Sequence, residues 1–159
     1  LKMRILLVSA VVVVIDQVTK ALTRTNLDLY DSIPVIPNFF HLTYVTNDGM
    51  AFGLNFPGGI YLFSAVSIIL TGVIFFYLWK EQHNHILMRL GLALILAGAV
   101  GNLIDRILFG TVVDFFDFMI VGHHWYIFNI ADSSVTVGMT IFLYFSFIVQ
   151  PKLQTTSVS

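Results

Sequence analysis

The side chains best suited to acid–base chemistry in this sequence are the aspartates of residues 98–132. That window holds five of the chain's 17 formal charges, although most residues around it are apolar. Charged groups at the edge of a membrane-length apolar run are costly unless they are paired or used. Asp114 and Asp132 are considered first, because two carboxylates within a few ångströms of each other share one proton. One can then act as a base on water and the other as an acid toward a carbonyl oxygen, which is the chemistry of aspartic proteases.

Each of these two aspartates also has a plainer interpretation. Asp132 directly precedes an apolar run that begins at Ser133, so it could simply cap the N-terminus of a helix. Asp114 alone could be a solvated loop acid, and Asp117 is its rival in the same VVDFFDF run. Residues an odd number apart on a strand point to opposite faces. We therefore expect Asp117 to lie apart from Asp114 and to be dispensable for catalysis.

Two adjacent histidines, His123 and His124, suggest a metal site together with Asp114 and Asp132. Neighbouring residues on a strand point to opposite faces, so both rings cannot reach one ion. We therefore predict no metal.

Residues 98–106 place polar and small side chains on one helix face. Gly98, Asn102 and Asp105 are spaced at i, i+4 and i+7. Gly98 and Gly101 permit two helices to approach closely. Asp105 and Arg106 can pair with each other or reach the site, and helix packing with a surface ion pair is the open alternative.

Asp16 and Lys20 stand four residues apart in the first apolar run. An internal ion pair is the least costly way to keep both charges there, so we predict a structural pair. The same two residues with Asp105 and Arg106 could form the relay of a small transporter or proton channel. Transporter sites usually lie near the membrane midplane, whereas here only Asp16 lies deeper than the helix ends. A purely structural subunit is a third possibility.

The composition is that of a membrane protein. The chain of 159 residues is 57% hydrophobic and only 11% charged, whereas soluble domains have about a quarter charged residues. A net charge of −1 gives no reason to expect nucleic-acid binding, and the absence of cysteine excludes a disulfide framework and a thiolate nucleophile. We predict one integral membrane domain over residues 1–159, with spans of about 20 residues each at about 4–23, 60–79, 86–106 and 133–150.

The lysines and arginines predict the orientation. Five of the eight fall on one side of a four-span arrangement, and the side richer in positive charge is cytoplasmic. Both termini are then cytoplasmic, residues 24–59 and 107–132 face outward, and the first span, residues 4–23, is a retained helix rather than a cleaved signal. The last residues, from Pro151, are predicted to be frayed.

The outward segments are predicted to form a small β-sheet on the helix ends. Residues 39–46 read as a strand, and a strand pair flanks Val121 and Gly122. Residues 50–56 are either a returning strand or a helical flap over the site. The expected fold is thus an all-α membrane bundle of four helices with a small outward sheet and a flap.

Five motifs together resemble those of lipoprotein signal peptidase, the bacterial signal peptidase II family. They occur in the family's order and cover most of the chain: DQVTK (16–20), NDGMAFG (47–53), GNLIDR (101–106), VVDFFDF (112–118) and FNIADSS (128–134). The resemblance implies an aspartic endopeptidase of the bacterial inner membrane with its active site at the outer face. Its substrates would be prolipoproteins carrying diacylglycerol on a cysteine, cut just before that cysteine, without metal or organic cofactor. Membrane lipid and globomycin-type inhibitors are the other implied partners, and we expect a monomer.

The resemblance also implies roles for individual residues. Asp114 and Asp132 match the catalytic dyad of the family. The polar and small residues matching those that support the site are Asn102, Asp105, Arg106, Asn129 and Ala131. Those matching the flap over the substrate are Asn47, Gly49, Ala51 and Phe52.

Overall fold

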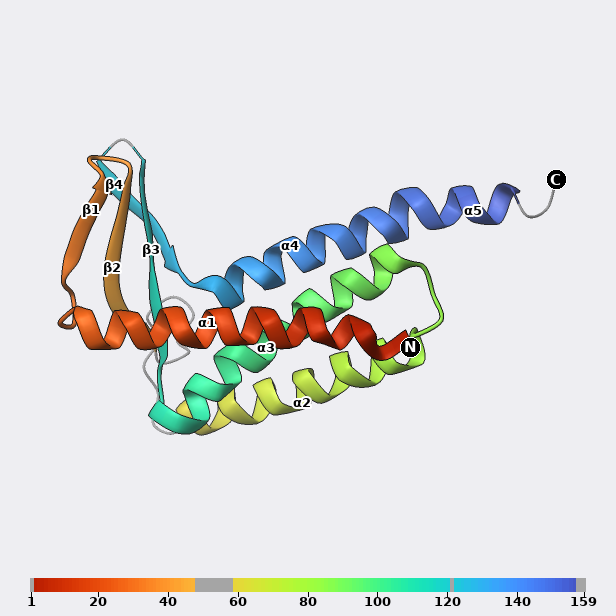
Figure 1. The fold of residues 1–159 in the computed structure, drawn as a ribbon, viewed down its shortest axis with the longest axis horizontal. Helices are drawn as coiled ribbons and strands as arrows, with labels where there is room; N and C mark the ends of the chain where they lie inside the picture. The colour runs from red at the N-terminus through yellow and green to blue at the C-terminus, as the bar shows by residue number, and fades with distance from the viewer. Residues whose placement is uncertain (1, 48–58, 121, 157–159) are drawn as a thin grey trace.

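The computed structural model describes residues 2–47, 59–120 and 122–156, and it places a helical bundle next to a small sheet (Figure 1). A 3₁₀ turn, η1 (Lys2–Ile5), leads into the first helix. The helices are α1 (Leu6–Asn26), α2 (Gly59–Lys80), α3 (Ile86–Phe109) and α4 (Ile130–Tyr144). The chain continues from α4 through a π-helical turn, η3 (Phe145–Val149), into α5 (Gln150–Thr156).

Four helices in the described ranges are long and apolar enough to cross a membrane, the same number as the apolar runs predicted from the sequence. The last one differs most from the prediction: it begins at Ile130 and stays helical beyond Pro151. The prediction of a frayed segment from Pro151 is therefore wrong for residues 151–156, and residues 157–159 lie outside the described ranges. The physical reason is the π turn, in which the Gln150 N–H reaches the Phe145 carbonyl. Pro151 has no N–H to donate, but it comes directly after a turn in which the usual i to i−4 hydrogen bonds are already interrupted.

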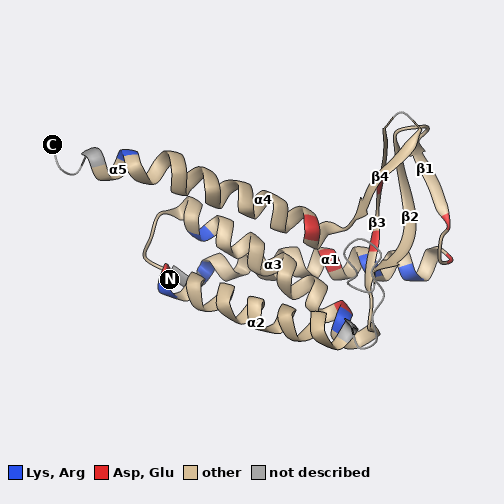
Figure 2. Ribbon diagram, turned by 180° about the vertical axis from the view of Figure 1, so that it is seen from behind, with Lys and Arg blue, Asp and Glu red and all other residues tan. Residues whose placement is uncertain are grey.

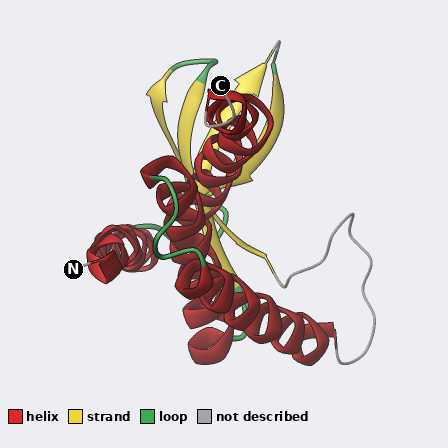
Figure 3. Cartoon of the chain, turned by 90° about the vertical axis from the view of Figure 1, so that its right-hand side faces the viewer, coloured by secondary structure: helices red, strands yellow, loops and turns green. Residues whose placement is uncertain are grey.

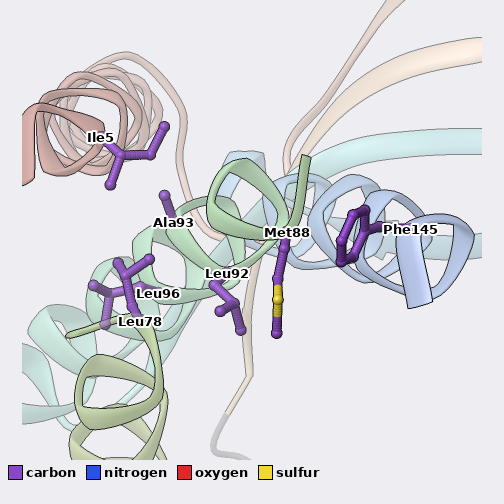
Figure 4. Close-up of a cluster of buried hydrophobic side chains, with 7 residues drawn as sticks. All are labelled: Ile5, Leu78, Met88, Leu92, Ala93, Leu96 and Phe145. Carbon is purple, nitrogen blue, oxygen red and sulfur yellow. The ribbon is translucent and has the colours of Figure 1, made fainter. Parts of the chain in front are cut away.

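The apolar core, whose side chains are drawn in Figure 4, lies in the half of the bundle away from the sheet, where α2 ends and α3 begins (Figure 1). It joins the end of η1, the end of α2, the first half of α3 and the π turn, through the side chains Ile5, Leu78, Met88, Leu92, Ala93, Leu96 and Phe145. Burial of these side chains stabilises the packing at about 25 cal/mol per Å² of apolar surface. The site described below therefore sits on helices that are fixed at their opposite ends.

Glycines bring α3 and α4 into close contact, as the sequence predicted. A Cβ at Gly98 would collide with the backbone oxygen of Ala131 and lie 2.5 Å from Val135 Cγ2. A Cβ at Gly101 would lie 2.6 Å from Asp16 Oδ2. Small residues at such positions allow helices to approach within van der Waals contact in membranes. The first turn of α4 is thereby pressed against the middle of α3.

The four strands form one antiparallel sheet in the order β1-β2-β3-β4, at the end of the bundle opposite η1 and α5 (Figures 1 and 3). β2 (Phe40–Asn47) confirms the strand predicted over 39–46. β3 (Val112–Ile120) and β4 (His123–Phe128) confirm the predicted strand pair. Residues 50–56, for which a strand or a flap was predicted, lie outside the described ranges.

β1 (Ser32–Ile36) has no counterpart among the predictions. Pro34 lies within it and Pro37 just after it, and proline disfavours the interior of a sheet. The structure places β1 at the edge of the sheet, paired only with β2 among the described strands. An edge strand tolerates proline, because one side of its backbone needs no ladder hydrogen bonds.

Candidate active site

Asp114 and Asp132 come from different elements and are bridged by two asparagine side chains. Asp114 lies buried on β3, and Asp132 lies in the first turn of α4. Asn129 Nδ2 donates to Asp114 Oδ1 at 2.6 Å, and Asn102 Nδ2 donates to Asp132 Oδ1 at 2.8 Å. Asn129 Nδ2 also lies 3.2 Å from Asn102 Oδ1, so the amides contact each other. The two carboxylates are thus held in one hydrogen-bonded array.

The helix α4 is capped by Asn129, not by Asp132 as the plainer interpretation had it. Asn129 Oδ1 accepts from the Asp132 N–H at 2.9 Å, and Asp132 Oδ2 accepts from the Asn129 N–H at 3.3 Å. This reciprocal pair is a capping box, with Asp132 three residues into the helix. An asparagine can accept at the helix start and still donate to Asp114, which an ionised aspartate cannot do. Asp132 remains at the positive end of the helix dipole.

The two carboxylates lie in different environments. Burial, and after it the neighbouring charge of Asp132, raises the pKa of Asp114 to about 7. The amides of Asn129 and Asn47 and the charge of Lys20 act in the opposite direction. Asn47 Nδ2 lies 3.5 Å from Asp114 Oδ2, at the end of β2. Asp114 therefore titrates near neutral pH, where a general acid is most effective.

A buried ion cluster lies behind the two asparagines. Lys20 Nζ lies 2.9 Å from Asp16 Oδ2 and 3.4 Å from Asp105 Oδ2, so the ion pair predicted between Asp16 and Lys20 is present. Lys20 Nζ also donates to Asn102 Oδ1 at 2.9 Å, which the sequence argument did not anticipate. Asp16 Oδ1 accepts the backbone N–H of Ala131 at 2.9 Å, so this cluster also fixes the start of α4.

Asp105 pairs with residues of α1 rather than with the neighbouring Arg106. Arg24 Nη2 lies 3.0 Å from Asp105 Oδ1, and Asp105 Oδ2 accepts the Val113 N–H at 3.0 Å. Arg106 Nη1 instead reaches Ser67 Oγ of α2 at 3.3 Å. Arg24 was missed as a partner, although it continues the four-residue spacing of Asp16 and Lys20 along one face of α1.

Asp117 is fully buried and has its own partners on the sheet. Thr43 Oγ1 donates to Asp117 Oδ2 at 2.6 Å, and His124 Nδ1 lies 2.8 Å from Asp117 Oδ1. His124 thus contacts Asp117 and not the carboxylate of Asp114. Asp117 and Asp114 occupy separate hydrogen-bonded groups on the same strand.

An apolar cavity of about 410 Å³ opens beside Asp132, between β4 and the start of α4. Its lining side chains are Tyr126, Phe128, Asp132, Ser133, Thr136 and Val137. The hydroxyls of Ser133 and Thr136 bond to backbone carbonyls one turn earlier, at 2.9 Å each, so they leave the wall apolar. Burial and then the carboxylates of Asp132 and Asp114 raise the pKa of Tyr126.

The array of two acids and two asparagines belongs to a chain that has clear relatives. The model of the family described as "Signal peptidase (SPase) II" matches residues 8–148. This chain belongs to the signal peptidase II family. The resemblance of the five motifs is thereby confirmed. Of the four residues that match the family's flap, Asn47 contacts Asp114. The other three, Gly49, Ala51 and Phe52, lie outside the described ranges.

Curated relatives and solved structures agree with this assignment. A lipoprotein signal peptidase of Desulforapulum autotrophicum is 47% identical over 146 residues, which are 89% of this chain and 90% of the relative. One from Staphylococcus aureus (strain JH9) is 41% identical over 138 residues, 87% of this chain and 84% of the relative. Two bacterial membrane enzymes, solved by the in meso method at 2.3 Å and 1.9 Å resolution, match with TM-scores of 0.76 and 0.77 and identities of 38% and 36%. They cover 98% and 91% of this chain, and the matches span 90% and 92% of their own chains. With its four apolar helices, the chain is a multi-pass membrane protein.

Proposed function

We propose that this chain is an aspartic endopeptidase that removes the signal peptide from prolipoproteins carrying diacylglycerol on a cysteine, cutting just before that cysteine. The relatives named above are lipoprotein signal peptidases. The observation that carries the proposal is the hydrogen-bonded array. Asn129 holds the buried Asp114, and Asn102 holds Asp132 at the start of α4. The transporter alternative has no comparable support, because the family assignment points to a peptidase.

The proposed reaction uses one shared proton and one water. At neutral pH the raised pKa of Asp114 keeps a large fraction of that carboxyl protonated, while Asp132 at the helix N-terminus is the carboxylate. Asp132 takes a proton from water as the water oxygen attacks the scissile carbonyl carbon, and Asp114 gives its proton to the carbonyl oxygen. Asp132 then passes its proton to the leaving nitrogen, and Asp114 recovers a proton from a hydroxyl of the tetrahedral intermediate as the C–N bond breaks. The products are a carboxylic acid and an amine, and the dyad returns to its starting state.

The surroundings of Asp132 suit a substrate with a large apolar group next to the scissile bond. The cavity between β4 and α4 shares Asp132 as a lining residue, and its other lining atoms are almost entirely apolar. Apolar ligands are stabilised in such pockets by the surface they remove from water. A globomycin-type inhibitor would compete for the same place.

We further propose that the site faces the outer side of the bacterial inner membrane. Most acidic positions gather at the end of the bundle that carries the sheet (Figure 2). The bias of lysine and arginine toward the other end favours a cytoplasmic location for that end. Substrates anchored by acyl chains in the outer leaflet would then meet the dyad at the membrane surface.

The test is cleavage of a synthetic diacylglyceryl-modified proprotein by purified enzyme, compared with the same proprotein without the lipid. Asp114→Asn and Asp132→Asn should each abolish turnover, because asparagine cannot exchange a proton. Asp28→Asn is a matched control, since Asp28 is an exposed carboxylate just after α1. Cleavage of the unmodified proprotein at the same rate would refute the substrate class. High residual activity in either dyad variant would refute the aspartic mechanism.

A further inference from the structure

Lys20 is a fully buried lysine whose ammonium group contacts the site as well as its ion-pair partners. Its exposed fraction is 0%. The three N–H donors of the ammonium face Asp16 Oδ2 at 2.9 Å, Asp105 Oδ2 at 3.4 Å and Asn102 Oδ1 at 2.9 Å. Two of these contacts balance charge. The third reaches an amide that itself holds Asp132.

The contact with Lys20 decides which end of the Asn102 amide faces the dyad. A lysine ammonium can only donate hydrogen bonds, so it can bind only the oxygen of a carboxamide. With Asn102 Oδ1 turned toward Lys20, Asn102 Nδ2 donates to Asp132 Oδ1 at 2.8 Å. The opposite orientation would place an oxygen against the Asp132 carboxylate. Asn129 Nδ2 also approaches Asn102 Oδ1, but at 3.2 Å and while shared with Asp114.

We propose that Lys20 is a positioning residue for the dyad: it fixes the Asn102 carboxamide so that this amide donates to Asp132 and holds the carboxylate in place for catalysis. This inference rests on the proposed function. It assigns Lys20 a task in turnover that an ion pair with Asp16 alone does not require.

Arg24 provides the matched comparison within the same cluster. Arg24 Nη2 pairs with Asp105 Oδ1 at 3.0 Å, and its guanidinium carbon lies 3.8 Å from the centre of the Phe109 ring. Arg24 and Lys20 together balance Asp16 and Asp105. Removing either cation leaves one uncompensated acid, but only the loss of Lys20 removes the ammonium that donates to Asn102 Oδ1 at 2.9 Å.

The experiment compares three variants in detergent or nanodiscs: Lys20→Met, Arg24→Met, and Lys20→Met combined with Asp16→Asn. The double variant restores charge balance. The carboxamide oxygen that it introduces at position 16 can still accept the Ala131 N–H, which Asp16 accepts at 2.9 Å. Melting temperature, kcat and KM are measured with a diacylglyceryl-modified proprotein, and kcat/KM is followed across pH.

We expect both Lys20 variants to lose about 100-fold in kcat with little change in KM, the order of loss caused by a misplacement of about 1 Å. The double variant should melt near the wild type and remain slow, whereas Arg24→Met should melt lower and keep its kcat. The alkaline limb of the pH profile should move to higher pH in both Lys20 variants. The Lys20 charge lowers the pKa of Asp114, so its removal lets that pKa rise. The other groups that face the dyad, including Arg106 and Tyr126, are unchanged in this comparison.

A double variant with wild-type kcat and an unshifted alkaline limb would overturn the inference and leave Lys20 as a structural partner. Equal loss of kcat in Arg24→Met would do the same. Failure of the proposed function would look different, since the wild type would then not cleave the lipidated proprotein, or Asp114→Asn would keep full activity.

Discussion

Replacing Gly98 by alanine should inactivate the enzyme more than it destabilises the fold. The new Cβ would overlap the backbone oxygen of Ala131 and lie 2.5 Å from Val135 Cγ2. Carbon atoms in favourable contact are about 3.5–4.0 Å apart, so the start of α4 must move by about 1 Å. Overpacking of this kind costs about 1–3 kcal/mol of stability. Because Ala131 directly precedes Asp132, the displacement falls on the dyad, where about 1 Å can cost about 100-fold in rate.

Gly91→Ala is the matched control on the same pair of helices. Its Cβ would lie 2.9 Å from the Gly138 oxygen and 2.9 Å from the Phe142 N, so it too forces α3 and α4 apart. Gly91 stands seven residues before Gly98, about two helical turns farther from the dyad. Thermal melts should show similar losses for both variants, while kcat should fall strongly only in Gly98→Ala. The reasoning is refuted if Gly98→Ala keeps its kcat, or if Gly91→Ala loses as much.

Three further outcomes are expected. Asp117→Asn should keep turnover, in contrast to Asp114→Asn. Its free energy of unfolding should fall by about 1–3 kcal/mol, because the fully buried carboxylate is replaced and its hydrogen bonds are weakened. A stable but inactive Asp117→Asn variant would instead assign the dyad to Asp117. The value of kcat/KM should decline as pH rises through about 7, because Asp114 acts as the acid and loses its proton above its raised pKa. A kcat/KM profile that stays flat to about pH 9 would contradict this assignment. Reporter fusions at Gln82 and Gly122 should read cytoplasmic and external, respectively, and the opposite pattern would place the dyad on the cytoplasmic side.

The sequence was most informative where a pattern is local. Apolar runs of about 20 residues identified the four helices, and alternating β-branched and aromatic residues identified three of the four strands. The four-residue spacing of Asp16 and Lys20 predicted an ion pair, and the structure has it at 2.9 Å. Motifs in five separate stretches were sufficient to place the chain in its family.

Contacts between distant segments could not be read in the same way. Nothing in the local sequence shows that Asn129 caps α4 while donating to Asp114, or that Asp105 accepts from the Val113 N–H. Aspartate and asparagine both favour helix starts, so the sequence left Asp132 open as a possible cap. Such choices depend on which acceptors the packing of the helices against the sheet brings together.

The buried cluster also constrains the order in which the protein can be made. Lys20 and Asn102 are separated by 82 residues, and Asp16 and Ala131 by 115. At the usual rate of synthesis, Asn102 leaves the ribosome roughly 4 to 16 s after Lys20. During that interval α1 must enter the bilayer before the partners that Lys20 has on α3 exist. The pairing of Lys20 with Asp16 within the same helix supplies the neutralising charge from the outset. The pair is complete within α1 before α3 is made, and Lys20 gains its contacts with Asp105 and Asn102 once α3 packs against α1.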